Sequence, residues 1–364
     1  MTISNESDPF YKRLSFNLIS IGLIATALYI GQDILLPLFF SMLLAALLLP
    51  AVKFLQRKKV PKILSVILSL AISLVLVFGV LYFLTTQVLN FLDDSDMIKE
   101  KFDGLLHDGQ KWVSQNFHVG IRKQNQYIHD TAEKIKTSGP ALVGKTFLSL
   151  TEIFSYLIFI PIYTFLLLYY KDLIKRFLVE SFKNSSEEHV VNILQECQTV
   201  SQHYILGLLI EMTIVFALNA AGFLILGIHY AIFLALVGAL LNLIPYVGML
   251  VANVFCMVIT MISSPELSDV LWVGVVLLAV QFIDNNFLMP LIVGSKVRIN
   301  ALATIVGVLI GGALCGVPGM FLAIPGVAVL KVISDRVDGL KAWGMLMGDP
   351  SADKQRDKLK STGL

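Results

Sequence analysis

Apolar runs of about 20 residues recur along most of this 364-residue chain and limit its fold more than any other feature. A run of that length is enough for a helix to cross the hydrocarbon core of a bilayer. The chain is 56% hydrophobic and only 15% charged, whereas soluble domains carry about 25% charged residues. A soluble core could not bury this much apolar sequence. We therefore predict an all-α polytopic membrane protein.

About eight transmembrane helices are predicted from these runs. They cover residues 14–31, 34–55, 63–91, 146–170, 204–227, 229–246, 247–263 and 268–291. A further apolar region, 301–333, contains a turn signal at Gly316-Val317-Pro318-Gly319. That turn predicts a hairpin, which either spans the membrane twice or is a re-entrant pair. Small residues at four-residue spacing in this region predict close helix packing; they are Gly307, Gly311, Gly312 and Gly316.

The runs divide the chain into four predicted regions. Residues 1–91 form an N-terminal segment of three membrane helices, and 92–145 form an extracytoplasmic insertion of amphipathic helices. The membrane core follows at 146–340 and includes a cytoplasmic amphipathic helix at 171–203. The last region, 341–364, is a polar tail.

Lysine and arginine predict the orientation, because they concentrate in cytoplasmic connections. The connections on one face of the predicted membrane domain, together with both terminal segments, hold 20 of the 28 basic residues. The short connections on the other face hold none, and the remaining eight lie in the 92–145 insertion. We therefore expect both termini to be cytoplasmic.

Several classes of function lack any signature in the sequence. There is no HExxH, GxSxG or P-loop motif, and Cys197, Cys256 and Cys315 form no CxxC pair. Basic residues occur in short clusters between apolar runs rather than in an extended patch. We therefore predict that the chain is not an enzyme, needs no cofactor or metal ion, and does not bind nucleic acid.

The stretch LAVQFIDNNFLMPLIVG, residues 278–294, places polar side chains where hydrocarbon is expected. A central carboxylate costs about 2.5–3.5 kcal/mol at membrane depth, so such groups usually face a cavity or a partner. On an α-helix, Gln281, Asp284 and Asn285 share one face, and Asn286 lies about 100° further round. Pro290 would free the carbonyl of Asn286, four residues earlier. We predict a broken, polar-lined helix; helix–helix glue or an interfacial position is the alternative.

Two other polar positions fall inside apolar runs. Asn242 precedes Pro245 in LLNLIPYVG, residues 240–248, which indicates a second helix break or an ordinary turn between spans. Glu211 lies in an otherwise uncharged span, with Asn219 two turns away on roughly the same face. Glu211 could carry a proton, or it could lie near the membrane interface.

Taken together, these stretches resemble the autoinducer-2 exporter family of bacterial membrane proteins, the PerM-type permeases. LLNLIPYVG resembles the family's Asn-x-Ile-Pro-Tyr-x-Gly stretch, and DNNFLMPLIVG at 284–294 is similar to its Asn-x-x-x-Pro-x-x-x-Gly helix, with Asn286 in the Asn position. Residues 307–330 resemble its Gly-Gly hairpin, and PIYTFLLLYYKD at 161–172 fits its fourth span. Members commonly carry Gly-Gln at the entrance of the fifth span, whereas Leu208 follows Gly207 here.

The resemblance implies transport in the bacterial inner membrane. Its leading form is export of a small polar solute, as in quorum-sensing export; the alternatives are sodium (cation)–proton antiport and a non-transporting membrane scaffold. The expected partners are the lipid bilayer, the solute or the cation and proton, and further copies of the chain in a homo-oligomer. The candidate site residues are Gln281, Asp284, Asn285, Asn286, Pro290, Asn242, Pro245 and Glu211.

Overall fold

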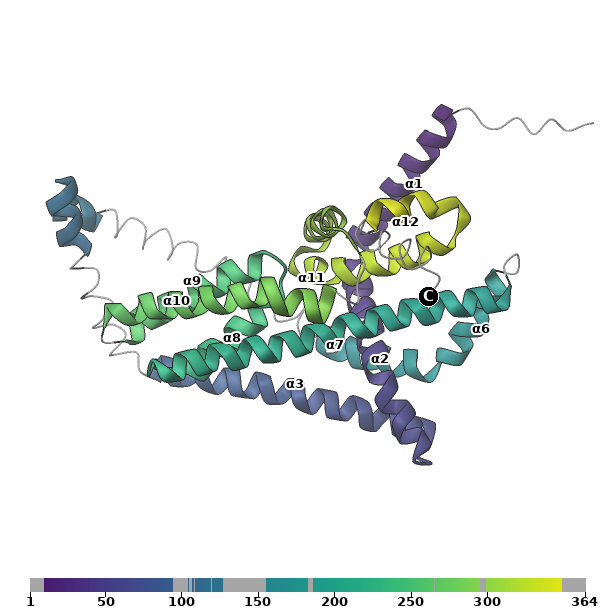
Figure 1. The fold of residues 1–364 in the computed structure, drawn as a ribbon, viewed down its shortest axis with the longest axis horizontal. Coiled ribbons are helices and arrows are strands. Elements are labelled where there is room, and N and C mark those ends of the chain that lie inside the picture. The colour runs from purple at the N-terminus through teal and green to yellow at the C-terminus, as the bar shows by residue number, and fades with distance from the viewer. Residues whose placement is uncertain are drawn as a thin grey trace, which may run out of the picture. The chain divides into compact units, whose positions relative to one another are not determined.

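A computed structural model shows the fold of most of the chain (Figure 1). It describes residues 10–93, 104, 107, 109–118, 120–126, 155–182, 186–264, 266–294 and 299–348. These residues are almost entirely helical and form no sheet, and their one isolated bridge joins Ile299 and Gly348. The predicted all-α class is confirmed. Most of the predicted 92–145 insertion and most of the 341–364 tail lie outside the described residues.

The described helices follow one another in chain order. They are α1 (Phe10–Ile30), α2 (Gln32–Arg57), α3 (Lys62–Asp93), a helix at Ser155–Tyr169, α6 (Lys171–Ser181), α7 (Glu187–Ile225), α8 (Ala231–Asn242), α9 (Val247–Ser263), α10 (Leu267–Ile283), the π-helix η1 (Asp284–Gly294), α11 (Ala301–Arg336), the short 3-10 helix η2 (Asp338–Leu340) and α12 (Lys341–Met347). Short helical turns also occur at 109–117 and 121–126.

Five helices of the described chain are long and apolar enough to cross a membrane. The count rises to six if Ser155–Tyr169 and α6 form one broken span. These helices support a polytopic membrane protein, with fewer full-length spans than the eight predicted. One reason is that α8 and α9 have only 12 and 17 residues, whereas a crossing needs about 20.

The chain divides into two compact units that are each built from separate stretches of sequence. One comprises Met1–Ala46, Lys171–Ser201 and Arg298–Leu364, and the other comprises Leu47–Tyr170 and Gln202–Val297. The four regions expected from the sequence are contiguous stretches of chain, whereas each unit combines several stretches, so the two divisions cannot be compared directly. The four regions stay predictions.

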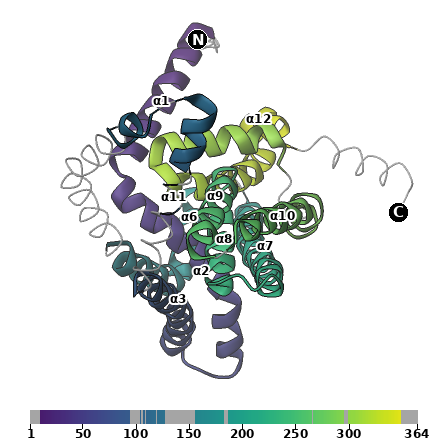
Figure 2. The same cartoon turned by 90° about the vertical axis from the view of Figure 1, so that its left-hand side faces the viewer.

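The second unit has its core where α7, α8, α9 and α10 pack together (Figures 1 and 2). Phe223, Leu234 and Val273, from three of these helices, are completely buried. α7 and α10 approach closely because Gly222 has no side chain: a Cβ there would lie 2.5 Å from Cγ1 of Val276. This close approach brings the part of α7 before Gly222, which carries Glu211 and Asn219, near the end of α10, where Asp284 follows.

A tight break joins α8 to α9 at residues 243–246. Tyr246 has a positive φ of 63°, which non-glycine residues seldom adopt. Gly248 follows on the first turn of α9, and a Cβ at this position would lie 1.7 Å from the backbone oxygen of Leu241. Only glycine fits there, so the Pro-Tyr-x-Gly signal in the sequence does mark a break.

In the other unit, α11 folds back on itself at Cys315 and Gly316, which have non-helical backbone angles. A Cβ on Gly311 would lie 2.4 Å from the oxygen of Gly319, and one on Gly307 would lie 2.7 Å from Val327. Such contacts cannot form along one straight helix, so the hairpin predicted from the turn signal is present. At 1.5 Å per residue its first arm, 301–314, rises about 21 Å and its second, 317–336, about 30 Å, so the choice between two spans and a re-entrant pair stays a prediction.

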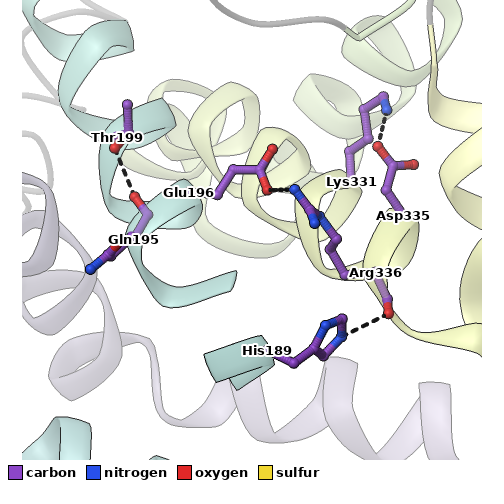
Figure 3. A network of polar contacts seen from close by, with 7 residues as sticks. All are labelled: His189, Gln195, Glu196, Thr199, Lys331, Asp335 and Arg336. Atoms are coloured by element: carbon purple, nitrogen blue, oxygen red, sulfur yellow. Dashed lines mark hydrogen bonds and ion pairs between the residues drawn. The ribbon is translucent and has the colours of Figure 1, made fainter. Parts of the chain in front are cut away.

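The end of α11 contacts the first turns of α7 through polar groups (Figure 3). Arg336 donates to Glu196 at 2.7 Å, and the backbone oxygen of Arg336 lies 3.3 Å from Nε2 of His189. Lys331 and Asp335 pair within α11. Because the side chains of Glu196 and Arg336 are more than 40% exposed, this pair stabilises the fold by about 1 kcal/mol at most.

Asn300 joins the start of α11 to the end of α12. Its Oδ1 accepts a hydrogen bond from the Ala303 backbone at 2.8 Å and so caps α11. Its Nδ2 donates to the backbone oxygens of Leu346 and Gly348, at 2.6 and 3.0 Å. One side chain thus satisfies backbone groups at two helix ends.

Replacement of Asn300 should therefore lower stability in two separable steps. Asn300→Ser keeps a capping oxygen and loses the two donated bonds, whereas Asn300→Ala loses both functions, for a total of about 1–3 kcal/mol. We expect Tm in detergent to fall in the order wild type, Ser, Ala. Equal Tm values for wild type and Asn300→Ala would show that this link contributes nothing.

The α8–α9 break gives a sharper prediction. Gly248→Ala places a methyl group on the Leu241 oxygen, so the break cannot form and little folded protein should be recovered. Gly274→Ala in α10 is the control, because its nearest neighbour would be Met257 at 3.7 Å, an ordinary contact. Size-exclusion chromatography and Tm of the two purified variants measure the difference. A monodisperse Gly248→Ala protein with wild-type Tm would contradict the geometry.

A buried carboxyl pair as candidate functional site

α7 carries two of the polar side chains on its buried face. Glu211, Val215 and Asn219 are spaced four residues apart, so they line one side of the helix. Glu211 is only 5% exposed and Asn219 only 3%. The sequence places this stretch in the middle of an apolar helix that is long enough to span the membrane.

Asp284 lies opposite, at the junction of α10 and η1, and is 3% exposed. Its carboxyl group is within hydrogen-bonding reach of the Glu211 carboxyl group. Asn242, the last residue of α8, donates from Nδ2 to Oδ2 of Asp284 at 3.1 Å. Residues 211, 242 and 284, which are remote in sequence, thus meet in space.

The polar cluster is incompletely paired. Oε2 of Glu211, Oδ1 of Asn219 and Oδ1 of Asp284 are buried and accept no hydrogen bond from the described residues. Among those residues, no ion pair includes either carboxyl group. Three acceptor oxygens without donors are costly to bury, so this arrangement suits a group that brings positive charge or a donor.

A small cavity adjoins the cluster between α7, α8, α9 and α10. Its volume is about 20 Å³, enough for about one water molecule. Its polar lining consists of Asn219, Asn242, Asn253, Gln281 and Asp284. The cavity could hold a water molecule or a small ion, whereas sites for organic ligands measure about 300–1,000 Å³.

Of the eight site residues proposed from the sequence, some lie at the carboxyl cluster or its cavity and others lie away from it. Glu211, Asn242, Gln281 and Asp284 lie at the cluster or its cavity. Asn285 is exposed and accepts a bond from Gln281 Nε2 at 3.0 Å. The remaining three do not line the cavity: they are Asn286 and Pro290, which are exposed, and Pro245, which lies in the α8–α9 break.

The expected consequence of Pro290 needs correction. The prediction assumed α-helical bonding, in which Pro290 would free the carbonyl of Asn286. Residues Asp284–Gly294 form a π-helix, in which each amide bonds the carbonyl five residues earlier. The proline therefore withholds a donor from the carbonyl of Asn285. The Asn286 side chain donates to the backbone oxygen of Phe282 at 2.8 Å instead of facing the cavity.

Two cavity residues were not among the proposed site residues. Asn219 had a sequence signal, because it is eight residues from Glu211 on the same helical face. Asn253 had little, since one amide in an apolar helix of 17 residues does not indicate which way it points. Only the packing of α9 against α8 and α10 brings it to the cavity.

Comparison with known proteins places these features in a family. The family model described as "AI-2E family transporter" matches residues 18–339. The Bacillus subtilis "Putative transport protein YrrI" is 28% identical over 83% of this chain and 86% of its own length. The Escherichia coli "Putative transport protein YhhT" is 22% identical over 96% and 98%, and the Escherichia coli "Putative permease PerM" is 25% identical over 55% of each chain. Since the family model covers nearly the whole chain, the protein belongs to the AI-2E transporter family, and its general function is membrane transport.

Proposed function

We propose that the protein is a secondary transporter of the bacterial cytoplasmic membrane in which the Glu211–Asp284 pair carries the coupling proton. The supporting observation is that these two carboxyl groups meet within membrane helices and form no ion pair with the described residues. Ionisable groups at such depth are costly and commonly mark proton or ion pathways. The cargo that the family resemblance implies is a small polar solute moved out of the cell.

The chemistry of the pair suits a proton carrier. Two ionised carboxylates side by side in a low-dielectric interior repel each other, so a proton shared between them lowers the free energy. Asn242 donates to Asp284 through Nδ2 and can hold its carboxyl group in place when the proton leaves. Loss of the proton then leaves two negative charges that must be compensated.

Helix–helix glue explains only part of the arrangement. The Asn242–Asp284 hydrogen bond, which joins two helices, is the contact that glue predicts. The unpaired oxygens of Glu211 and Asn219 do not fit this explanation, because polar groups hold helices together only when they pair with each other. The Gln281–Asn285 and Asn286–Phe282 bonds lie within one stretch of helix and join no neighbours. These facts favour a functional role for the pair.

Cation–proton antiport is the second candidate, and the size of the cavity favours it. A volume of about 20 Å³ accommodates an ion, whereas a polar solute would require the helices to separate. The scaffold alternative has less support, since the family's description is that of transporters.

The proposed proton carrier can be tested in proteoliposomes that contain a fluorescent pH indicator. Proton movement is followed across a panel of small polar solutes and alkali cations under an imposed pH gradient. Glu211→Gln and Asp284→Asn should each abolish proton-coupled transport, because a neutral amide cannot exchange the proton. Glu188→Gln makes the same chemical change at an exposed position of α7 and should retain wild-type coupling. Normal coupling in both pair variants would exclude the pair as the carrier.

The proposed orientation, with cytoplasmic termini, makes an independent prediction. In intact spheroplasts, a tag after Leu364 and a tag inserted between Arg57 and Lys62 should both be protected from an impermeant antibody or protease. A tag at Gly109 should be accessible to an impermeant antibody or protease. Finding Gly109 on the same side as the C-terminus would reverse the assignment. Assembly into a homo-oligomer is part of the same proposal and is tested by the mass of the purified complex.

A further inference from the structure

A strongly basic turn joins α2 to α3 (Figure 1). The chain carries no acidic residue between Asp33 and Asp93, whereas five cations fall within residues 53–62. They are Lys53, Arg57, Lys58, Lys59 and Lys62. Both helices are long and apolar enough to cross a membrane, so the turn between them lies at a membrane face. The proposed proton carrier makes no use of this turn.

Four of these cations have no acidic partner among the described residues. Lys53, Arg57, Lys58 and Lys59 are exposed, and none of them forms an ion pair with that part of the chain. Lys53 and Arg57 are four residues apart, so they lie on one face of α2 and repel each other. Lys58 lies over the ring of Phe54, 5.9 Å from its centre. The turn therefore holds positive charge that these residues do not compensate.

The local backbone explains only part of this charge. Arg57 lies in the last turn of α2, where the helix dipole favours a cation. Lys62 is the first residue of α3, where the dipole disfavours one. Lys59 has a positive φ of 64°, a left-handed conformation that glycine adopts most easily. The geometry of the turn therefore does not account for the lysine side chains at these two positions.

Exposed apolar side chains lie among the cations. Phe54 is 60% exposed and Ile63 is 50% exposed. Lys62 lies over the ring of Tyr169, 5.5 Å from its centre, and so links the start of α3 to the end of the helix at Ser155–Tyr169. Membrane orientation explains why basic residues gather on one face, but it does not require apolar surface beside them. The turn presents cations that suit a phosphate group and apolar surface that suits an acyl chain.

We propose that the α2–α3 turn binds an anionic phospholipid of the adjoining leaflet, with its phosphate at Arg57, Lys58 and Lys59 and an acyl chain against Phe54. Clusters of about four to eight basic residues next to a membrane helix are typical of sites for anionic lipids. Arginine and lysine donate strong, charge-assisted hydrogen bonds to phosphate. The bound lipid offsets the repulsion among the cations. A soluble polyanion matches the charge but not the exposed Phe54 and Ile63. This inference goes beyond the proposed function and does not depend on it.

Native mass spectrometry of the purified full-length protein in a neutral detergent tests the site. The probes are phosphatidylglycerol and phosphatidylcholine with identical acyl chains, because only the first carries a net negative charge. The wild type should bind phosphatidylglycerol at least tenfold more tightly. Lys58→Gln combined with Lys59→Gln should weaken that binding about thirtyfold, about 2 kcal/mol for two basic residues. Equal affinity of the wild type for the two lipids would overturn the inference.

Two double variants serve as controls for this loss. Lys58→Arg with Lys59→Arg keeps both charges and should retain the preference, which separates loss of charge from loss of fold. Arg122→Gln with Lys123→Gln removes two exposed charges from a helical turn outside α2 and α3 and should bind phosphatidylglycerol like the wild type. Equal weakening in this second control would show that only the total charge matters, and the assignment to the turn would be wrong.

Two further measurements identify the ligand as a lipid rather than a free anion. Phe54→Ser removes the apolar contact and should weaken phosphatidylglycerol binding several-fold, whereas inorganic phosphate at the same concentration as the lipid should not displace it. Displacement by phosphate, or wild-type affinity in Phe54→Ser, would contradict the proposed contact with an acyl chain. Phosphatidylglycerol should also raise the Tm of the wild type, because a ligand that binds only the folded protein stabilises it. An unchanged Tm at saturating lipid would count against the site.

Discussion

Burial of two carboxyl groups against each other constrains the packing of all the helices around them. Burial costs each carboxyl group several kcal/mol of solvation, and a proton shared between the two groups can offset that cost only if they lie close together. α7 and α10 therefore need to approach closely, and Gly222 permits this by leaving room for Val276. α8 must end at Asn242 so that its amide reaches Asp284, and the Gly248 turn makes that ending possible.

Small residues accommodate the same requirement in the middle of the unit. Ala235 and Ala239 of α8 are completely buried, and Ala252 of α9 is 4% exposed. Because the driving force for helix association in lipid is close packing rather than the hydrophobic effect, small side chains at these positions bring the backbones together. The small cavity lined by Gly238 is the space that these closely packed helices leave around the amide side chains. Packing and polarity thus depend on each other here.

The sequence allowed the fold class and the breaks to be predicted, but not the number of full-length spans. Apolar composition indicates that a segment prefers lipid, and it continues across the 243–246 break without any change. The breaks were found because glycine and proline act locally: Gly248 meets a backbone oxygen, and Gly316 has a positive φ of 61°. The pairing of residues 211 and 284 has no local signal, because it depends on how α7 and α10 pack.

Helical spacing predicted part of the site and failed at one identifiable point. Gln281 and Asp284 both reach the cavity, as the three-residue spacing requires. The helix then changes to π geometry at Asp284, so each later residue is rotated from its α-helical position. Asn285 and Asn286 consequently lie on the exposed side.

The two candidate cargoes make opposite demands on this packing. A polar solute needs a site of about 300 Å³ or more, so α8 would have to move away from α7 and α10, which would separate Asn242 from Asp284 and expose alanine contacts. A monovalent cation, of the kind that the antiport alternative requires, needs little more than the volume of about 20 Å³ already present. The close packing at this site is therefore more compatible with the antiport alternative than with a polar solute bound between the same helices.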